Sequence, residues 1–121
     1  DWEHYLTLAH HLHQDSSFAV CDEAKWRCAM SRAYYAVFGR AKCQLVYKEH
    51  QNLPKKDVHS WVIRMYLEDE SRERKKIGKN LKQLQIDRTI ADYQEYSEVT
   101  SSMAQTSIIV AKATMTFLKK L

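Results

Sequence analysis

The sequence predicts an all-α protein, folded as an up-and-down antiparallel bundle of four to five helices. Only one proline and two glycines interrupt 121 residues, whereas helix formers such as Ala, Leu, Lys, Gln and Glu are abundant. Apolar residues also recur at helical spacing in segments that short connectors join. A sheet of several hairpins would need more turn residues. We expect one domain over residues 1–121, because a chain of this length buries one core.

The first two helices are predicted over residues 2–14 and from Asp22 to about Tyr47. Asp1 and Asp22 are good N-caps for them, and a loop containing "QDSS" joins them. The second helix is apolar around most of its circumference, so we expect it at the centre of the bundle. Its apolar residues are Trp26, Met30, Ala33, Val37 and Ala41, with Tyr34, Phe38 and Leu45 beside them.

Three more helices are predicted after the connector "KEHQNLPKK". A short helix begins near Asp57 and ends at "EDES", and a basic helix follows it and ends in a corner at "TIADYQEY". Ser97 and Glu98 open the last helix, which reaches the C-terminus. The face expected to pack in the basic helix carries Ile77, Leu81, Leu84 and Arg88. In the last helix that face carries Val99, Met103, Ile108, Ile109, Ala113 and Phe117.

The cysteine and charge content favour a cytoplasmic protein without a disulfide framework. Cys21, Cys28 and Cys43 form no CxxC pair, which predicts reduced thiols and no zinc site. No apolar run is long enough to span a membrane, and Asp1 opens directly into an amphipathic pattern, so we expect no leader and no membrane contact. A formal charge of +4 and a pI near 9.0 tilt the surface towards anionic partners.

Histidines cluster in the first helix without the pattern of a metal site. The helical directions of His10, His11 and His13 differ, and no carboxylate or cysteine stands at ligand spacing on that face. We therefore expect these histidines to face solvent. The sequence predicts neither a bound metal nor a cofactor.

Three blocks in the sequence resemble the HEPN family of helical domains. They are "AMSRAYYAVFGRAKCQL" at 29–45, "HSWVIRMYL" at 59–67 and "LKQLQIDRTIADY" at 81–93. The resemblance implies a four- to five-helix bundle and frequent homodimerisation. In prokaryotes it also implies frequent pairing with a minimal nucleotidyltransferase in toxin–antitoxin or defence modules. His59 stands where this family often has a histidine, and we expect it to cap a helix or form a hydrogen bond.

The same resemblance raises the question of RNA cleavage. Active members of the family are metal-independent ribonucleases with an Arg, four to six intervening residues and then a His, and two copies of this motif meet at a dimer interface. None of the six histidines follows an arginine at that spacing. Where the motif would lie, Arg88 is followed after four residues by Tyr93. A tyrosine with a pKa near 10 is a poor general base at pH 7, so this departure disfavours an enzyme.

Arg88, Asp92 and Tyr93 are the first candidate ligand site. In one interpretation Arg88 pairs with Asp92 at helical spacing and Tyr93 packs its ring on the end of the bundle. In the other, these residues form part of an anion- or nucleotide-binding groove, because an arginine suits bidentate contact with a phosphate.

Arg32 and Tyr35 are the second candidate site. Consecutive helical residues are about 100° apart, so one of Tyr34 and Tyr35 enters the core and the other lies at its rim, where its hydroxyl finds a partner. Arg32 lies on the side of the small residues Ala36 and Gly39, which let a helix or a ligand approach. Packing and ligand contact both remain open for this site.

A third candidate is the basic flank of the fourth helix, which is either a solvated face or an electrostatic track for RNA or an acidic partner. Its residues are Arg72, Arg74, Lys75, Lys76, Lys79 and Lys82.

We interpret the sequence as a HEPN-like binding module of a prokaryotic two-component system of the toxin–antitoxin or defence type. We expect it to form a homodimer, to bind nucleotide or RNA, and to pair with a nucleotidyltransferase-type protein. Two alternatives are a metal-independent ribonuclease that uses Arg88 and Tyr93, and a purely structural dimerisation domain.

Overall fold

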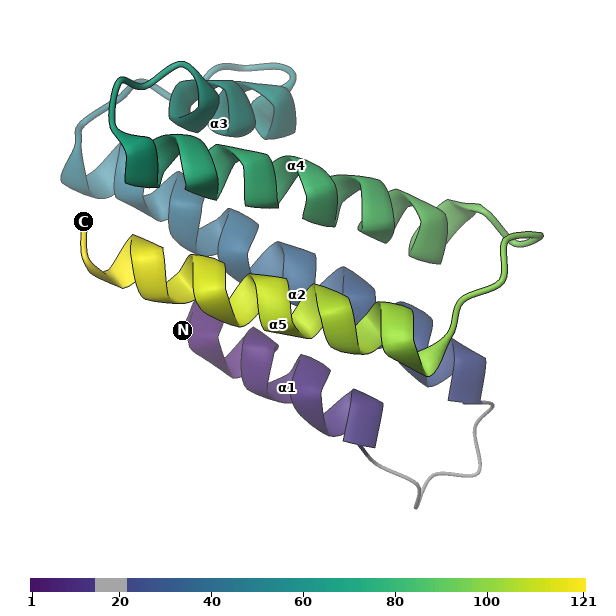
Figure 1. Ribbon diagram of the computed structural model, residues 1–121. Helices are drawn as coiled ribbons and strands as arrows, with labels where there is room; N and C mark the ends of the chain where they lie inside the picture. Colours follow the sequence, from purple (N-terminus) through teal and green to yellow (C-terminus); the bar gives the residue numbers. More distant parts are fainter. Residues whose placement is uncertain (15–21) are drawn as a thin grey trace.

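The protein is a bundle of long helices (Figure 1). The computed structural model describes residues 1–14 and 22–121, so most of the expected "QDSS" loop and Cys21 lie outside the described residues. No strand occurs in these residues, and the predicted all-α bundle is confirmed. The helices are α1 (Trp2–Gln14), α2 (Asp22–Cys43), the π-helical turn η1 (Gln44–Lys48), α3 (Val58–Leu67), α4 (Arg72–Tyr93) and α5 (Ser101–Lys119).

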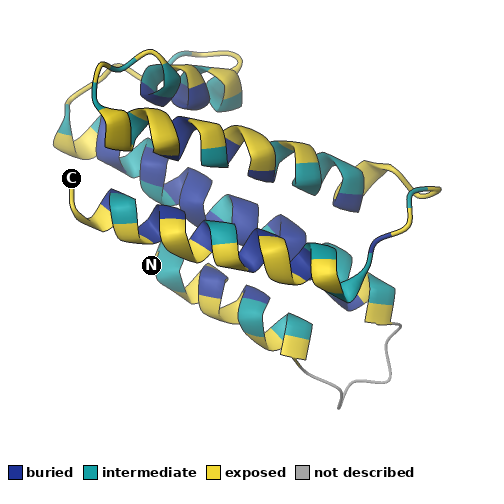
Figure 2. Cartoon of the chain, in the orientation of Figure 1, coloured by how far each residue is buried: buried dark blue, intermediate teal, exposed yellow. Residues whose placement is uncertain are grey.

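α2 lies at the centre of the bundle, as predicted, and contacts α1, α3, α4 and α5 (Figure 2). Small residues such as Ala29, Ala33 and Ala36 are fully buried along it and let the neighbouring helices approach closely. Most of the predicted apolar residues are buried too, while Trp26 is half-buried. After Cys43 the turn widens into η1, which carries the helix to Lys48, close to its predicted end.

α1 packs mainly on α2, with Trp2 over Gly39. A Cβ atom at position 39 would overlap the Trp2 ring, so a larger residue would force the ring to shift. The small residues on this side of α2 therefore admit a helix of the same chain. None of the described helices combines the length and apolar character needed to cross a bilayer.

α4 is longer than predicted, and the corner expected over "TIADYQEY" begins only at Gln94. The helix continues to Tyr93, and its last turn is stabilised from α2. The guanidinium of Arg27 donates hydrogen bonds to the carbonyls of Ile90, Ala91 and Gln94 at 3.0 to 3.2 Å. The last carbonyls of a helix lack partners within it and attract a cation, so Arg27 makes the additional turn favourable.

α5 begins later than predicted. Ser97 and Glu98 lie in the connector, and Thr100 is the N-cap, because its Oγ1 accepts a hydrogen bond from the backbone N–H of Met103 at 3.2 Å. Thr100 combines an extended backbone with this capping hydroxyl. The carbonyl of Ser97 accepts instead from Arg27, which fixes the connector outside the helix.

The buried face of α5 also differs from the prediction. Ile109 and Ala113 are exposed, whereas Ser107 and Thr114 are buried. Asn80 of α4 donates to Oγ1 of Thr114 at 3.0 Å, so this buried hydroxyl has a partner across the helix interface. The interface with α4 thus includes small polar residues that an apolar pattern does not identify.

Candidate functional site

The candidate site lies where α2, α3 and α4 meet, and we call Arg32, Tyr34, Tyr35, His59, Arg88 and Asp92 the Arg88 cluster. The two adjacent tyrosines separate as expected, since Tyr34 is fully buried and Tyr35 is half-buried. Their rings meet edge-on, with centroids 5.3 Å apart. The two tyrosine rings of the cluster therefore extend from the buried core to the surface.

Arg88 is held by both a carboxylate and aromatic side chains. Its Nε donates to Oδ2 of Asp92 at 3.0 Å, and its Nη2 donates to the hydroxyls of Tyr35 at 2.6 Å and Tyr93 at 3.4 Å. The guanidinium carbon also lies 5.1 to 5.9 Å from the ring centroids of Tyr34, Tyr35 and Tyr93. Nη1 makes no hydrogen bond within the described part of the chain.

Arg32 joins the cluster through Ser31. Its Nη2 donates to Ser31 Oγ at 3.1 Å, and that hydroxyl donates to Asp92 Oδ2 at 3.2 Å. The Arg32 guanidinium lies 5.2 Å from the Tyr35 ring centroid, and its Nε is buried without a partner among the described residues. Arg88 contacts the Asp92 carboxylate directly and Arg32 is linked to it only through Ser31, so the cluster holds two guanidinium groups and one carboxylate, with one positive charge in excess.

His59 of α3 completes the cluster. Its Nδ1 lies 2.6 Å from the Tyr34 hydroxyl, and its ring stacks on Phe38 with centroids 4.0 Å apart. Burial, together with the charges of Arg88 and Lys42, lowers the pKa of His59. Burial raises the pKa of the Tyr34 hydroxyl. At neutral pH the pair is therefore a neutral imidazole and a protonated phenol, and the expected hydrogen-bonding role of His59 is confirmed.

A cleft of about 520 Å³ opens beside the cluster, between the start of α2 and the end of α4. Asp92 and Tyr93 line it on one side, and Glu23 and Glu95 add carboxylates. Arg27, also in its wall, is occupied by the carbonyls at the end of α4. The cleft is therefore rich in hydrogen-bond acceptors, while the free donor of Arg88 belongs to the cluster.

Comparison with known proteins decides the family. The model of the HEPN domain matches residues 6–121, nearly the whole chain. The chain belongs to the HEPN family. No curated protein and no solved structure matches it.

In this HEPN chain the Arg88 cluster contains a histidine, His59, that is far from Arg88 in the sequence. The position five residues after Arg88 holds Tyr93, which is 68% exposed. The imidazole in the cluster belongs to His59 of α3, and its ring centroid lies 5.7 Å from that of Tyr34 and 6.1 Å from that of Tyr35. A search for Arg and His close in sequence cannot find groups that come from two different helices.

Not all side chains of the basic flank of α4 are exposed. Arg74 was expected in it, but its side chain is 14% exposed and forms a bidentate pair with Glu49 at 2.9 Å. Its Nε also lies 3.1 Å from Asp69. Burial alone would lower the pKa of Arg74, but the hydrogen bond and charge of Glu49 raise it. Arg74 therefore ties α4 to the segment after η1. The other five residues are exposed, namely Arg72, Lys75, Lys76, Lys79 and Lys82.

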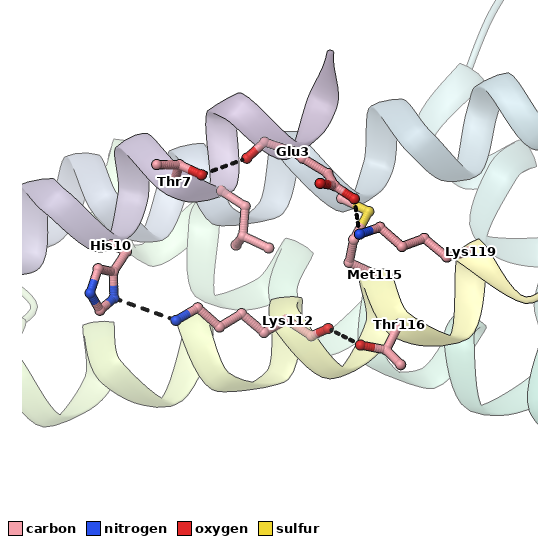
Figure 3. A pocket seen from close by; sticks show the side chains of 8 residues that line it. Glu3, Thr7, His10, Lys112, Met115, Thr116 and Lys119 are labelled. Atoms are coloured by element: carbon pink, nitrogen blue, oxygen red, sulfur yellow. Dashed lines mark hydrogen bonds and ion pairs between the residues drawn. The ribbon is translucent and has the colours of Figure 1, made fainter.

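A separate groove lies between α1 and α5 (Figure 3). Lys119 forms an ion pair with Glu3 across it, and Lys112 lies 3.5 Å from Nδ1 of His10. We call these four residues, with the floor formed by Leu6 and Met115, the α1–α5 groove. Each lysine of the groove thus contacts a side chain of α1, Lys119 that of Glu3 and Lys112 that of His10.

The histidines of α1 do not all face solvent. His11 is exposed, but Nε2 of His13 lies 3.0 Å from Oγ of Ser101 and 3.1 Å from its carbonyl oxygen, so the prediction for His13 is wrong. The contact ties the end of α1 to the start of α5. In residues 1–14 and 22–121, no group of three or more His, Cys, Asp or Glu side chains could hold a metal ion.

Proposed function

We propose that this HEPN protein is a binding module that holds the phosphate of a nucleotide or of RNA at the Arg88 cluster. The free Nη1 of Arg88 carries the proposal, because the rest of that guanidinium is fixed by Asp92 and Tyr35. A fixed guanidinium loses little side-chain entropy on binding, and the N–H groups of Nη1 can donate charge-assisted hydrogen bonds to phosphate oxygens. Arg32 adds a second positive charge.

The surrounding groups suit the other parts of a nucleotide. Ribose hydroxyls and exocyclic amines are hydrogen-bond donors, and the carboxylates of Glu23, Asp92 and Glu95 are acceptors in the adjoining cleft. The exposed ring of Tyr93 provides a face on which a base can stack.

The proposed biological setting is a prokaryotic two-component system of the toxin–antitoxin or defence type. Membership of the HEPN family supports it. In this setting the protein forms a homodimer and pairs with a nucleotidyltransferase-type partner. Copurification of the two proteins, with the mass of the complex, tests the pairing.

Thermal unfolding with a panel of nucleoside 5′-phosphates tests the binding module. A ligand present at 100 times its dissociation constant should stabilise the fold by about 2.7 kcal/mol. We expect this shift in the wild type and in the control Lys119→Gln, and its loss in Arg88→Gln. An absent shift in the wild type, or an equal shift in Arg88→Gln, would contradict the proposal and favour a purely structural domain.

Metal-independent RNA cleavage is the second candidate function. It is favoured by the neutral imidazole of His59, which shares the cluster with Arg88. If Nδ1–H donates to Tyr34, Nε2 is available as a general base at neutral pH. Incubation with RNA in EDTA tests this. Cleavage by the wild type that Arg88→Ala and His59→Ala both abolish would establish it, and a Tyr93→Phe arm tests Tyr93 in the same role.

A further inference from the structure

The side of α4 that faces away from the bundle carries exposed residues along its length (Figure 2). Successive members are three, four, three, four and seven residues apart, which places them on one face of the helix. At 1.5 Å per residue the ridge is about 30 Å long. The α4 ridge consists of Arg72, Lys75, Lys79, Lys82, Ile86 and Tyr93.

The first half of the α4 ridge is positively charged. Within residues 1–14 and 22–121, none of its four cations forms an ion pair with a carboxylate. Lys75 donates to the carbonyl of Leu67 at 3.3 Å, and Lys82 lies 3.5 Å from the amide oxygen of Gln85. Arg74 differs, because Glu49 and Asp69 neutralise it. Glu70 lines the same hollow as Arg72, Lys75 and Lys79 but forms no ion pair with them in the described part of the chain, so the first half of the ridge carries a net positive charge.

The second half of the ridge is apolar and aromatic. Ile86 is 45% exposed and Tyr93 is 68% exposed. The Tyr93 hydroxyl lies 3.4 Å from Nη2 of Arg88, so the end of the ridge meets the Arg88 cluster. An exposed ring can stack on a base only if that base is free of a duplex, which favours a single strand.

We propose that the α4 ridge binds single-stranded nucleic acid. Neighbouring cations lie about 4.5 to 6 Å apart along the helix axis, so each can contact its own phosphate. An unstacked base lies on Tyr93, and the strand continues into the Arg88 cluster. This last contact rests on the proposed function, whereas the contacts from Arg72 to Lys82 do not.

The salt dependence of binding tests the ridge. The probes are fluorescent oligouridylate and oligodeoxythymidylate of about 12 nucleotides, within the size range of single-strand sites. Each neutralised phosphate adds about 0.7 to the slope of log affinity against log salt for single strands. Lys79→Gln with Lys82→Gln should therefore reduce the slope by about 1.4. The control removes two charges elsewhere, by Lys112→Gln with Lys120→Gln, and should leave the slope unchanged.

Further binding measurements test the stacked base and identify the ligand. Tyr93→Leu should weaken binding by about tenfold without changing the slope, as expected for the loss of one stacked base. Oligouridylate that binds more tightly than oligodeoxythymidylate would identify RNA, and equal affinities would identify single strands of either kind. Equal losses of slope in the ridge and control variants would overturn the proposal. So would equal affinity for a blunt duplex or for polyglutamate.

Arg88→Gln separates this inference from the proposed function. If it leaves oligonucleotide affinity unchanged while the ridge variant loses it, the ridge stands and the phosphate site at Arg88 fails. If Arg88→Gln abolishes nucleotide binding while the ridge variant binds oligonucleotides as the wild type does, only the ridge fails.

Discussion

The Arg88 cluster and the α1–α5 groove both combine cations with a histidine, yet they differ in how the cations are held. In the groove, the Lys119 side chain is 53% exposed and pairs with Glu3, itself 42% exposed. In the cluster, the Arg88 side chain is 16% exposed and rests against aromatic rings. Exposed pairs of long side chains contribute little and rearrange easily. Arg88 is fixed by its neighbours, and its Nη1 has no hydrogen-bond partner among the described residues. It is therefore better suited to binding a ligand than Lys119 of the groove.

The largest expected difference between the two regions is the loss of stability when one aromatic side chain is removed from each. Tyr34→Ala removes a fully buried ring under the cluster and should lower the free energy of unfolding by about 3 to 5 kcal/mol, because it leaves a cavity. Tyr5→Ala, at a 40% exposed position of α1, should cost less than about 1 kcal/mol. Urea unfolding measures both. Similar losses in the two variants would show that the cluster is no more rigidly built than α1.

The next effect concerns how Arg88 is held. Tyr35→Phe removes the hydroxyl that accepts from Nη2 and should lower the free energy of unfolding by about 1.5 kcal/mol, the low end for hydrogen bonds to charged groups. Tyr47→Phe, at an exposed position, serves as the matched control. If both variants unfold at the wild-type urea concentration, the hydroxyl of Tyr35 does not hold Arg88.

The sequence could predict the helices but not the contacts between distant ones. Periodicity placed α1, α2 and α3 close to their observed bounds, since their apolar stripes begin and end with the helix. It failed at the end of α4, where Arg27 of α2 satisfies carbonyls more than 60 residues away in sequence. It also misplaced the buried face of α5, because Ser107 and Thr114 are buried polar residues with partners on α4.

A smaller effect is the pH dependence of stability. Burial and the neighbouring charges of Arg88 and Lys42 lower the pKa of His59 below 6.5. The unfolded chain therefore binds a proton between that lowered pKa and 6.5, where the folded chain does not, so stability falls as the pH drops through this window. His59→Gln should flatten this part of the profile. Urea unfolding at several pH values measures it, and parallel profiles would contradict it.

The smallest effect lies in the groove. Burial first, and then the charge of Lys112, lowers the pKa of His10. Lys112→Gln removes that charge and should raise the pKa of His10, with little change in stability because the lysine is exposed. An NMR titration of the imidazole measures the shift. An unchanged pKa would show that Lys112 does not act on His10 in solution.

The candidate site was only partly predictable for the same reason as the fold. The resemblance to the family motif points to Arg88 and Tyr93, and helical spacing predicts the ion pair of Arg88 with Asp92. The angle between adjacent helical residues predicts that only one of Tyr34 and Tyr35 is fully buried. The assembly of these groups with His59 depends on how α3 packs against α2, which no local pattern specifies. Arg74 was misassigned because its partner Glu49 lies on another segment.

The side-chain nitrogens of arginine and lysine provide the most direct test of the central claim. In protein labelled with ¹⁵N, a nucleoside 5′-monophosphate should shift the Nε and Nη resonances of Arg88, assigned from the spectrum of Arg88→Lys. The Nζ resonances of Lys112 and Lys119 in the α1–α5 groove should stay in place. Shifts of the two lysines while Arg88 stays unchanged would contradict a phosphate site at the Arg88 cluster.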